Sequence, residues 1–225
     1  MEPASTQSLR LAIDDTQSVS ALLCAPADAR AGYVFAHGAG AGMGHRFMAD
    51  FAGGLAARGI ATLRYQFPFM EQGSKRPDTP KVAHAAVRAA VAEAARRLPC
   101  LPLLAGGKSF GGRMTSQAQA AEPLAGVGGL AFLGFPLHPA GKPSDDRAEH
   151  LYDVAVPMLF LQGSRDELAD LTLLRPVVKA LGARATLEVF DQADHSFHVP
   201  ARSGRKDAEV RAAMLDALAA WIARA

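Results

Sequence analysis

Short apolar runs alternate along the chain with segments whose apolar residues recur every three or four positions. The runs have the length of strands and cover residues 32–36, 60–65, 101–105, 127–135, 156–161 and 185–190. Phe47, Phe51 and Leu55 are spaced by four residues, which predicts a helix that ends at Gly59. Similar spacing predicts helices in the Ala-rich segment after residue 81, over residues 171–181 and near the C-terminus. Apolar runs joined by helices are typical of parallel strands with crossover helices.

The beginning of the chain follows a different pattern. Leu9, Leu11 and Ile13 occupy alternate positions, and an apolar run over residues 19–24 follows the polar segment 14–18. Such alternation predicts an antiparallel hairpin at the edge of the sheet. We therefore predict an α/β fold with an eight-stranded, mostly parallel sheet, an antiparallel N-terminal hairpin and helices on both faces, in a single domain over residues 1–225.

The composition is that of an average globular protein. The 225 residues are 49% hydrophobic and 20% charged, which argues against a disordered chain. Lys and Arg exceed Asp and Glu by 24 − 22 = +2, and the basic residues are scattered. Because a nucleic-acid-binding protein needs a basic patch, we expect no nucleic-acid partner.

Neither the cysteines nor the N-terminus indicates a metal site, an export signal or a membrane anchor. Cys24 and Cys100 belong to no CxxC or Cys/His spacing, so we expect no structural zinc. Residues 1–7 lack the basic and then apolar stretch of a signal peptide, and no run approaches the about 18 apolar residues of a membrane helix. We expect a cytoplasmic protein with no membrane partner, and the sequence carries no signal for its oligomeric state.

The main chemical signal is Gly107-Lys108-Ser109-Phe110-Gly111, which matches the G-x-S-x-G motif between a predicted strand and a predicted helix. A nucleophile at such a turn needs glycines two residues to either side, because the backbone is strained and neighbouring chains approach closely. The start of the helix also brings N–H groups and a positive dipole end near a developing oxyanion. The alternative is a glycine-rich turn with an incidental serine.

A serine hydroxyl becomes a good nucleophile only beside a base, which in turn needs a carboxylate to orient it. Asp166 lies just beyond the predicted strand 156–161, and His195 lies just after the predicted strand 185–190. The three candidates therefore lie at the carboxyl ends of strands, where open α/β sheets bind their ligands. We predict Ser109 as nucleophile, His195 as general base and Asp166 as the carboxylate.

Other residues near the same strand ends compete for these roles. Asp170, Asp191 and Asp194 are the alternative carboxylates, and each could instead be a turn residue or a helix cap. His198 is the alternative base. His37, beside its glycines, is expected to fix its own loop by hydrogen bonds.

Nearly the whole chain resembles the α/β-hydrolase superfamily, whose members carry nucleophile, acid and histidine in this order. The resemblance is closest to the small lidless members, namely dienelactone-hydrolase-like esterases and the KANL/Tex-type hydrolase-like group. It rests on the loop His37-Gly38-Ala39-Gly40, the serine motif through Arg113, Gly163-Ser164-Arg165-Asp166, and Asp194-His195-Ser196-Phe197. It implies that the backbone N–H groups of Phe110 and Ala39 form the oxyanion hole.

Basic residues near the serine mark a departure from generic esterases, which more often carry an uncharged residue before it. Lys108, Arg113, Lys75 and Arg76 could form a cationic rim for an acidic substrate, or could simply be solvated.

Two phosphate-binding motifs resemble parts of the chain. Gly107-Lys108-Ser109 imitates the end of G-x-x-x-x-G-K-[ST], but the first glycine of that motif would fall at Pro102. The glycines of residues 38–44 do not complete G-x-G-x-x-G, so a dinucleotide site is the less favoured alternative.

We therefore expect hydrolysis of a small-molecule ester, thioester or lactone through an acyl-enzyme on Ser109, without a metal or organic cofactor. The alternatives are a non-catalytic interaction scaffold with a hydrolase fold, and an acyltransferase or perhydrolase that uses the same triad. Only 20 residues separate Phe135 from Val156 (156 − 135 − 1), too few for a multi-helix cap. We expect an open pocket with Phe67, Phe69 and Phe135 as apolar walls.

Overall fold

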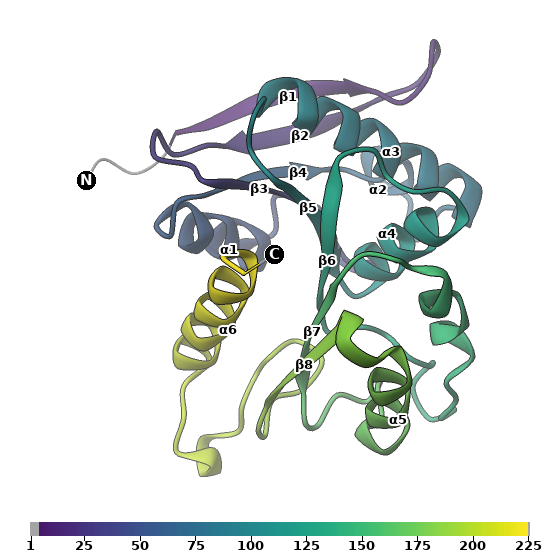
Figure 1. The fold of residues 1–225 in the computed structure, drawn as a ribbon, viewed down its shortest axis with the longest axis vertical. Coiled ribbons are helices and arrows are strands. Elements are labelled where there is room, and N and C mark those ends of the chain that lie inside the picture. Colours follow the sequence, from purple (N-terminus) through teal and green to yellow (C-terminus); the bar gives the residue numbers. More distant parts are fainter. Residues whose placement is uncertain (1–4, 225) are drawn as a thin grey trace.

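A computed structural model describes residues 5–224 and contains an eight-stranded sheet (Figure 1). The strands are β1 (Thr6–Ala12), β2 (Ser18–Cys24), β3 (Ala31–Ala36), β4 (Ile60–Tyr65), β5 (Leu103–Lys108), β6 (Val127–Leu133), β7 (Met158–Gly163) and β8 (Ala185–Phe190). Their order across the sheet is β1-β2-β4-β3-β5-β6-β7-β8. β2 pairs antiparallel with β1 and β4, and all other neighbours pair parallel. The predicted sheet and its N-terminal hairpin are confirmed.

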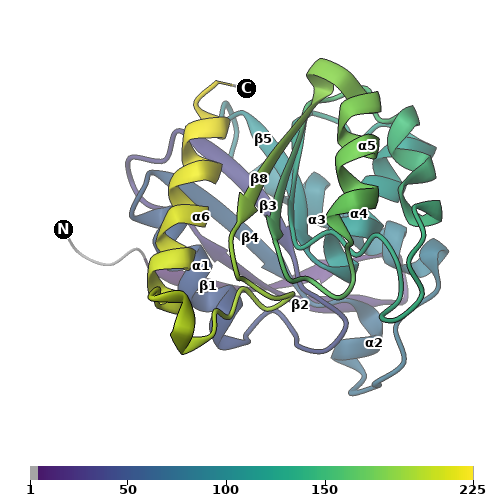
Figure 2. The ribbon, with the colours of Figure 1, turned by 90° about the horizontal axis from the view of Figure 1, so that it is seen from below.

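Helices cover both faces of the sheet, as predicted (Figure 1 and Figure 2). α1 (Arg46–Ala56) and α6 (Asp207–Ile222) lie side by side on one face. α3 (Pro80–Arg97), α4 (Phe110–Ala121) and α5 (Leu171–Leu181) lie on the other. On α1 the predicted stripe of Phe47, Phe51 and Leu55 faces the core: Phe51 and Leu55 are buried together with Met48, and Phe47 is half-buried.

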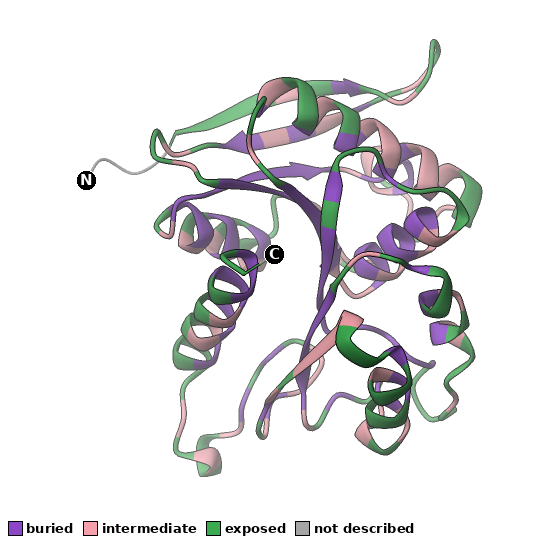
Figure 3. Cartoon of the chain, viewed as in Figure 1, coloured by how far each residue is buried: buried purple, intermediate pink, exposed green. Residues whose placement is uncertain are grey.

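The core consists of two apolar layers, one between the sheet and each group of helices. Every residue of β3 and β4 is buried, because these strands lie inside the sheet and are covered on both sides. The edge strand β1 is mostly exposed, and the outer faces of the helices are exposed as well (Figure 3). The central strands are therefore the most buried part of the molecule, and their carboxyl ends position the side chains that follow them.

Some boundaries differ from the predicted ones. β5 begins at Leu103, after Pro102, and continues to Lys108, so the strand ends directly before Ser109. The predicted loop 66–81 contains the short helix α2 (Pro68–Glu71) and the beginning of α3. Both helices begin with a proline, which fits the first helical position because proline has no N–H group and an N–H group there would have no partner within the helix.

The connection between β6 and β7 contains a single 3₁₀ helix, η1 (Asp146–Asp153). Within the described chain this connection holds no cap of several helices, as its length and composition predicted. Among residues 5–224, no helix is long and apolar enough to cross a membrane.

Candidate active site

The turn between β5 and α4 holds Ser109 in a strained conformation, with φ 51° and ψ −117°. Its flanking glycines are required by close packing against the end of β3. A Cβ atom on Gly107 would lie 2.3 Å from the carbonyl oxygen of Ala36, and one on Gly111 would lie 2.4 Å from that of His37. The glycines therefore allow β5, Ser109 and α4 to pack directly onto the neighbouring strand, which is the geometry that the motif predicted.

Ser109, His195 and Asp166 form a continuous chain of hydrogen bonds. His195 Nε2 lies 2.8 Å from Ser109 Oγ, and His195 Nδ1 lies 2.8 Å from Asp166 Oδ2. In the neutral tautomer that satisfies both contacts, Nδ1–H donates to the carboxylate and Nε2 accepts from the hydroxyl. The histidine side chain is 25% exposed and the aspartate side chain is fully buried. The structure thus brings the three predicted residues together.

The buried carboxylate of Asp166 has further hydrogen-bond donors. Gln162 Nε2 donates to Oδ2 at 2.5 Å, and the backbone N–H group of Leu168 donates to Oδ1 at 2.8 Å. Gln162 Oε1 in turn accepts from the backbone N–H group of Phe135 at 2.9 Å. Because a buried charge is costly unless it is hydrogen-bonded, these donors make an ionised carboxylate tolerable at this position.

The alternative carboxylates have local structural roles. Asp170 caps α5 by accepting from the N–H group of Thr172. Asp194 Oδ1 accepts from two N–H groups of its own turn. Asp191 Oδ1 accepts from Ser164 Oγ at 3.1 Å. Of the four candidates, only Asp166 contacts the imidazole of His195.

Among the other histidines, His198 and His37 form hydrogen bonds with groups other than Ser109. His198 pairs on the surface with Asp207 at 2.9 Å, and this pairing raises its pKa. His37 is buried, its Nδ1 lies 2.7 Å from the carbonyl oxygen of Gly38, and its Nε2 accepts from the N–H group of Phe67 at 2.9 Å. Burial lowers the pKa of His37 to about 4. His37 therefore fixes its loop as a neutral side chain, which agrees with the structural role expected for it.

Two backbone segments flank Ser109 where an oxyanion would form. Phe110 is the first residue of α4, so its N–H group has no acceptor within the helix. The loop after β3 approaches from the opposite side: a Cβ atom on Gly38 would lie 3.7 Å from Ser109 Cβ, and Ala39 lines the same cavity as the serine. Both residues predicted for the oxyanion hole thus lie beside the serine.

The cavity that contains Ser109 has a volume of about 450 Å³ and is walled mainly by apolar side chains. It is lined by Gly38, Ala39, Gly40, Ala41, His45, Phe47, Met48, Lys108, Ser109, Leu168, His195 and Ser196. The prediction that Phe67, Phe69 and Phe135 form its walls is wrong. These rings are 0%, 2% and 0% exposed and belong to the core, where they pack against other aromatic rings.

Of the four residues considered for a cationic rim, only Lys108 lines this cavity. Its ammonium group already donates to the backbone carbonyl oxygen of His195 at 2.5 Å. Lys75 and Arg76 are surface residues, and the guanidinium of Arg113 is partly buried beside Arg147. The cavity therefore offers no unpaired cation to an acidic substrate.

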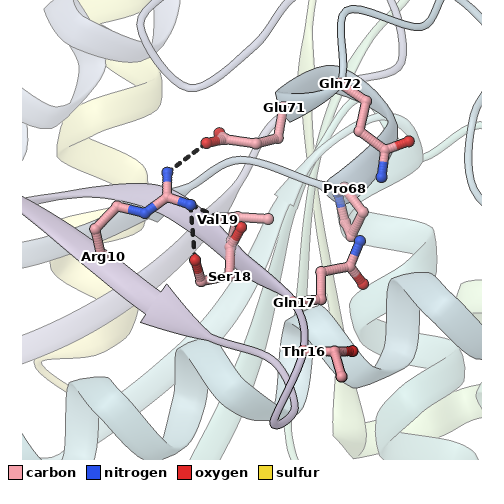
Figure 4. A pocket seen from close by; sticks show the side chains of 8 residues that line it. All are labelled: Arg10, Thr16, Gln17, Ser18, Val19, Pro68, Glu71 and Gln72. Carbon is pink, nitrogen blue, oxygen red and sulfur yellow. Dashed lines mark hydrogen bonds and ion pairs between the residues drawn. The ribbon is translucent and has the colours of Figure 1, made fainter.

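A second groove of about 630 Å³ lies between the β1–β2 hairpin and α2 (Figure 4). Its two charged residues, Arg10 and Glu71, pair with each other at 2.5 Å, and Arg10 also donates to Ser18 Oγ at 2.7 Å. Because these groups satisfy one another, the groove presents no unpaired charge to a ligand. Among residues 5–224, no group of three or more His, Cys, Asp or Glu side chains is placed to hold a metal ion.

An eight-stranded sheet of this order, with a serine at the turn after β5 and no large cap within residues 5–224, is the architecture of lidless α/β hydrolases. The family model described as "Alpha/beta hydrolase domain" matches residues 29–223, and the chain belongs to this family. The predicted resemblance is thereby confirmed.

Solved structures of the same class cover almost the whole chain. A dienelactone hydrolase from Anabaena variabilis matches with a TM-score of 0.79 and 18% identity over 99% of both chains. XC6422 from Xanthomonas campestris, described as a serine hydrolase without a lid, matches with a TM-score of 0.74 and 21% identity over 98% of this chain and 97% of its own. Est1E from Butyrivibrio proteoclasticus, solved with ferulic acid, matches with a TM-score of 0.72 and 17% identity over 94% of this chain and 99% of its own. At these identities, the likenesses establish the fold.

Proposed function

We propose that this hydrolase cleaves small, uncharged carboxylic esters, thioesters or lactones through an acyl-enzyme on Ser109. The observation that carries the proposal is the hydrogen-bond chain from Ser109 Oγ through His195 to the buried Asp166, with 2.8 Å at each step. Such a chain activates a hydroxyl that would otherwise be a weak nucleophile.

In the acylation step, Ser109 Oγ attacks the carbonyl carbon of the substrate while His195 Nε2 takes the hydroxyl proton. The imidazolium that forms keeps its Nδ1–H bond to Asp166, whose negative charge stabilises it. The tetrahedral intermediate collapses when Nε2 returns the proton to the leaving oxygen or sulfur, which departs as the alcohol or thiol.

The backbone N–H groups of Phe110 and Ala39 stabilise the oxyanion of this intermediate. The positive end of the α4 dipole adds to their effect. A single oxyanion-hole donor is worth about 3 kcal/mol in related systems. In deacylation, a water molecule deprotonated by His195 attacks the acyl group, and the 25% exposure of the imidazole leaves solvent a route to it.

The cavity supports a small, uncharged substrate. Phe47, Met48 and Leu168 provide apolar contact area near Ser109, and the ammonium of Lys108 is engaged by protein. A substrate carboxylate at this position would lose its hydration without gaining a free cationic partner, which is costly. Neutral acyl and alcohol groups avoid this cost.

A scaffold role is the competing function, and the spatial arrangement of the site disfavours it. A non-catalytic hydrolase fold has no need for a serine, an imidazole and a buried carboxylate in hydrogen-bond contact, or for a strained turn that exposes the serine.

Ser109→Ala tests the proposal, because it removes a hydroxyl from the cavity and little packing. We expect wild-type protein to hydrolyse p-nitrophenyl acetate and to be labelled by a fluorophosphonate. We expect Ser109→Ala to lose at least about 10³-fold in kcat, together with the label. Ser196→Ala, which changes another serine of the same cavity, is the matched control and should keep both. A folded wild-type protein that shows neither turnover nor labelling would support the scaffold instead.

A further inference from the structure

The side chain of Lys108 runs beneath the loop that carries His195. Its Nζ donates to the backbone carbonyl oxygen of His195 at 2.5 Å and lies 5.3 Å from the centre of the Phe197 ring. A Cβ atom on Gly134 would lie 3.0 Å from Nζ and 3.3 Å from His195 Nδ1. The ammonium therefore occupies a narrow space bounded by the end of β6 and the loop after β8.

This contact joins two segments that are otherwise distant in sequence. Lys108 immediately precedes Ser109 at the end of β5, whereas His195 belongs to the loop between β8 and α6. The hydrogen bonds accepted by Asp194 close the loop's own turn, and those of Arg165 N–H to the carbonyl oxygen of Ala193 and of Gln192 N–H to Ser164 Oγ tie it to the loop after β7. The bond from Lys108 instead connects the backbone of the base directly to the strand that ends at the nucleophile.

We infer that Lys108 is a positioning residue for His195, whose ammonium holds the loop so that Nε2 stays within hydrogen-bond distance of Ser109 Oγ. The inference rests on the proposed function of Ser109 and His195. It also explains why a basic residue precedes the serine: Lys108 serves the catalytic geometry and leaves no charge for the substrate. A displacement of about 1 Å at a reacting group can lower a rate by 10²-fold, so the bond that holds the backbone of His195 itself matters even though other bonds hold the rest of the loop.

The charged state of Lys108 should control the strength of the anchor. The titratable groups that face its amine are Asp166 after β7, and Asp194 and His195 in the loop after β8. Burial lowers the pKa of Lys108 to about 8, and the two carboxylates oppose this shift without cancelling it. Below pH 8 the ammonium makes a charge-assisted hydrogen bond, and above pH 8 the neutral amine makes a weaker one. Activity should therefore fall as the pH rises through about 8.

Stability should change in the opposite direction. The pKa of Lys108 is about 8 in the folded protein, against 10.5 for a lysine side chain in water, so the unfolded chain binds more protons between these values. The contribution of Lys108 to the free energy of unfolding therefore rises with pH from about 8 to 10.5. A purely structural lysine would not couple rising stability to falling activity over the same pH interval.

The test compares wild type with Lys108→Met, which keeps most of the length of the side chain but removes the donor, and with Lys108→Arg, which stays charged. Lys81→Met, at an exposed position of α3, is the matched control. We would measure kcat and KM for p-nitrophenyl acetate from pH 6 to 10, the melting temperature, and hydrogen exchange of the peptide over residues 191–199. Hydrogen exchange reports on the loop even if the proposed esterase activity is wrong.

For Lys108→Met we expect kcat to fall by roughly 10²-fold with KM little changed, faster exchange over residues 191–199, and loss of the decline in kcat near pH 8. Lys108→Arg should recover part of kcat and also lack that decline, and Lys81→Met should match wild type. Unchanged exchange in a folded Lys108→Met protein would overturn the inference, whether or not the protein is an esterase. Wild-type kcat in Lys108→Met, or a decline near pH 8 that persists in it, would equally overturn it.

Discussion

Asp166→Asn separates the proposed role of this carboxylate from a merely structural one. Asp166 Oδ2 accepts from His195 and Gln162, and Oδ1 accepts from the N–H group of Leu168, so each oxygen faces only donors. An asparagine must turn its NH₂ group toward one of these sides. Gln162 cannot reverse its amide to compensate, because its Oε1 accepts from the N–H group of Phe135.

Both orientations of the asparagine leave one donor facing another in a buried site. If the NH₂ group faces His195, the histidine must accept at Nδ1, its proton moves to Nε2, and it can no longer take the proton of Ser109. If the NH₂ group faces Leu168, the tautomer survives, but the negative charge that stabilises the imidazolium is lost. The unsatisfied donor costs about 1–3 kcal/mol of stability in either case, which is less than the 5–15 kcal/mol of a typical domain. The variant should therefore fold.

The expected loss of activity is much larger than the loss of stability. An imidazole in the wrong tautomer lowers kcat by roughly 10⁴-fold, which corresponds to about 5.5 kcal/mol at about 1.4 kcal/mol per factor of ten. The assay is kcat for p-nitrophenyl acetate together with a thermal melt, with Asp170→Asn and Asp194→Asn as matched controls that should retain kcat. If one of the two controls loses activity and Asp166→Asn is mild, the assignment of the carboxylate is wrong.

Three further outcomes follow from the cavity, the turn and the surface histidine. In a series of p-nitrophenyl esters, kcat/KM should stop rising beyond about four acyl carbons, because an open cavity buries few further CH₂ groups at ~0.8 kcal/mol each; a maximum at about ten carbons, or a jump in activity at micelle formation, would refute this. Gly111→Ala should destabilise the fold, because its Cβ atom would lie 2.4 Å from the carbonyl oxygen of His37. The control Gly53→Ala, on the exposed face of α1, should instead raise the melting temperature. An unchanged melting temperature in Gly111→Ala would contradict the packing described at this turn. His198→Gln should keep wild-type kcat. The stability that the pairing of His198 with Asp207 contributes should be present below pH 6.5 and be lost as the pH rises through the raised pKa of His198. Melting curves of both proteins at pH 5 and pH 8 measure this contribution, and an equal effect of the substitution at the two pH values would argue against the pairing.

The sequence predicted the sheet and the meeting of Ser109, Asp166 and His195 because both depend on the order of elements along the chain. Parallel strands end at one edge, so residues that directly follow them converge there whatever the details of packing. The glycines on either side of Ser109 could also be predicted, because the tight turn after the strand leaves no room for a Cβ atom at these positions and the G-x-S-x-G motif reflects this requirement.

The walls of the cavity could not be predicted, because their positions depend on the direction of each side chain. Phe67 follows β4 as expected, but its N–H group bonds to His37 and its ring turns into the core. The spacing of Phe47 predicts only a helix, whereas the three-dimensional structure shows that Phe47 and Met48, at the beginning of α1, line the cavity of the serine. The sequence shows that Lys108 is unusual beside the serine, but it does not show the partner, which lies 87 residues further along the chain. The signal that could have identified it is the strand position itself, since a long basic side chain at the end of a buried strand must find an acceptor.

Trapping of the acyl-enzyme is the most direct measurement of the proposed chemistry. Protein is quenched in acid during turnover of p-nitrophenyl acetate, and its intact mass is measured by mass spectrometry. Proteolysis and analysis of the peptides then locate the acetylated residue. We predict a mass increase of one acetyl group, located on the peptide that contains Ser109 and absent from Ser109→Ala. An acetyl group on a different residue during turnover, or undiminished turnover by Ser109→Ala, would contradict hydrolysis through Ser109.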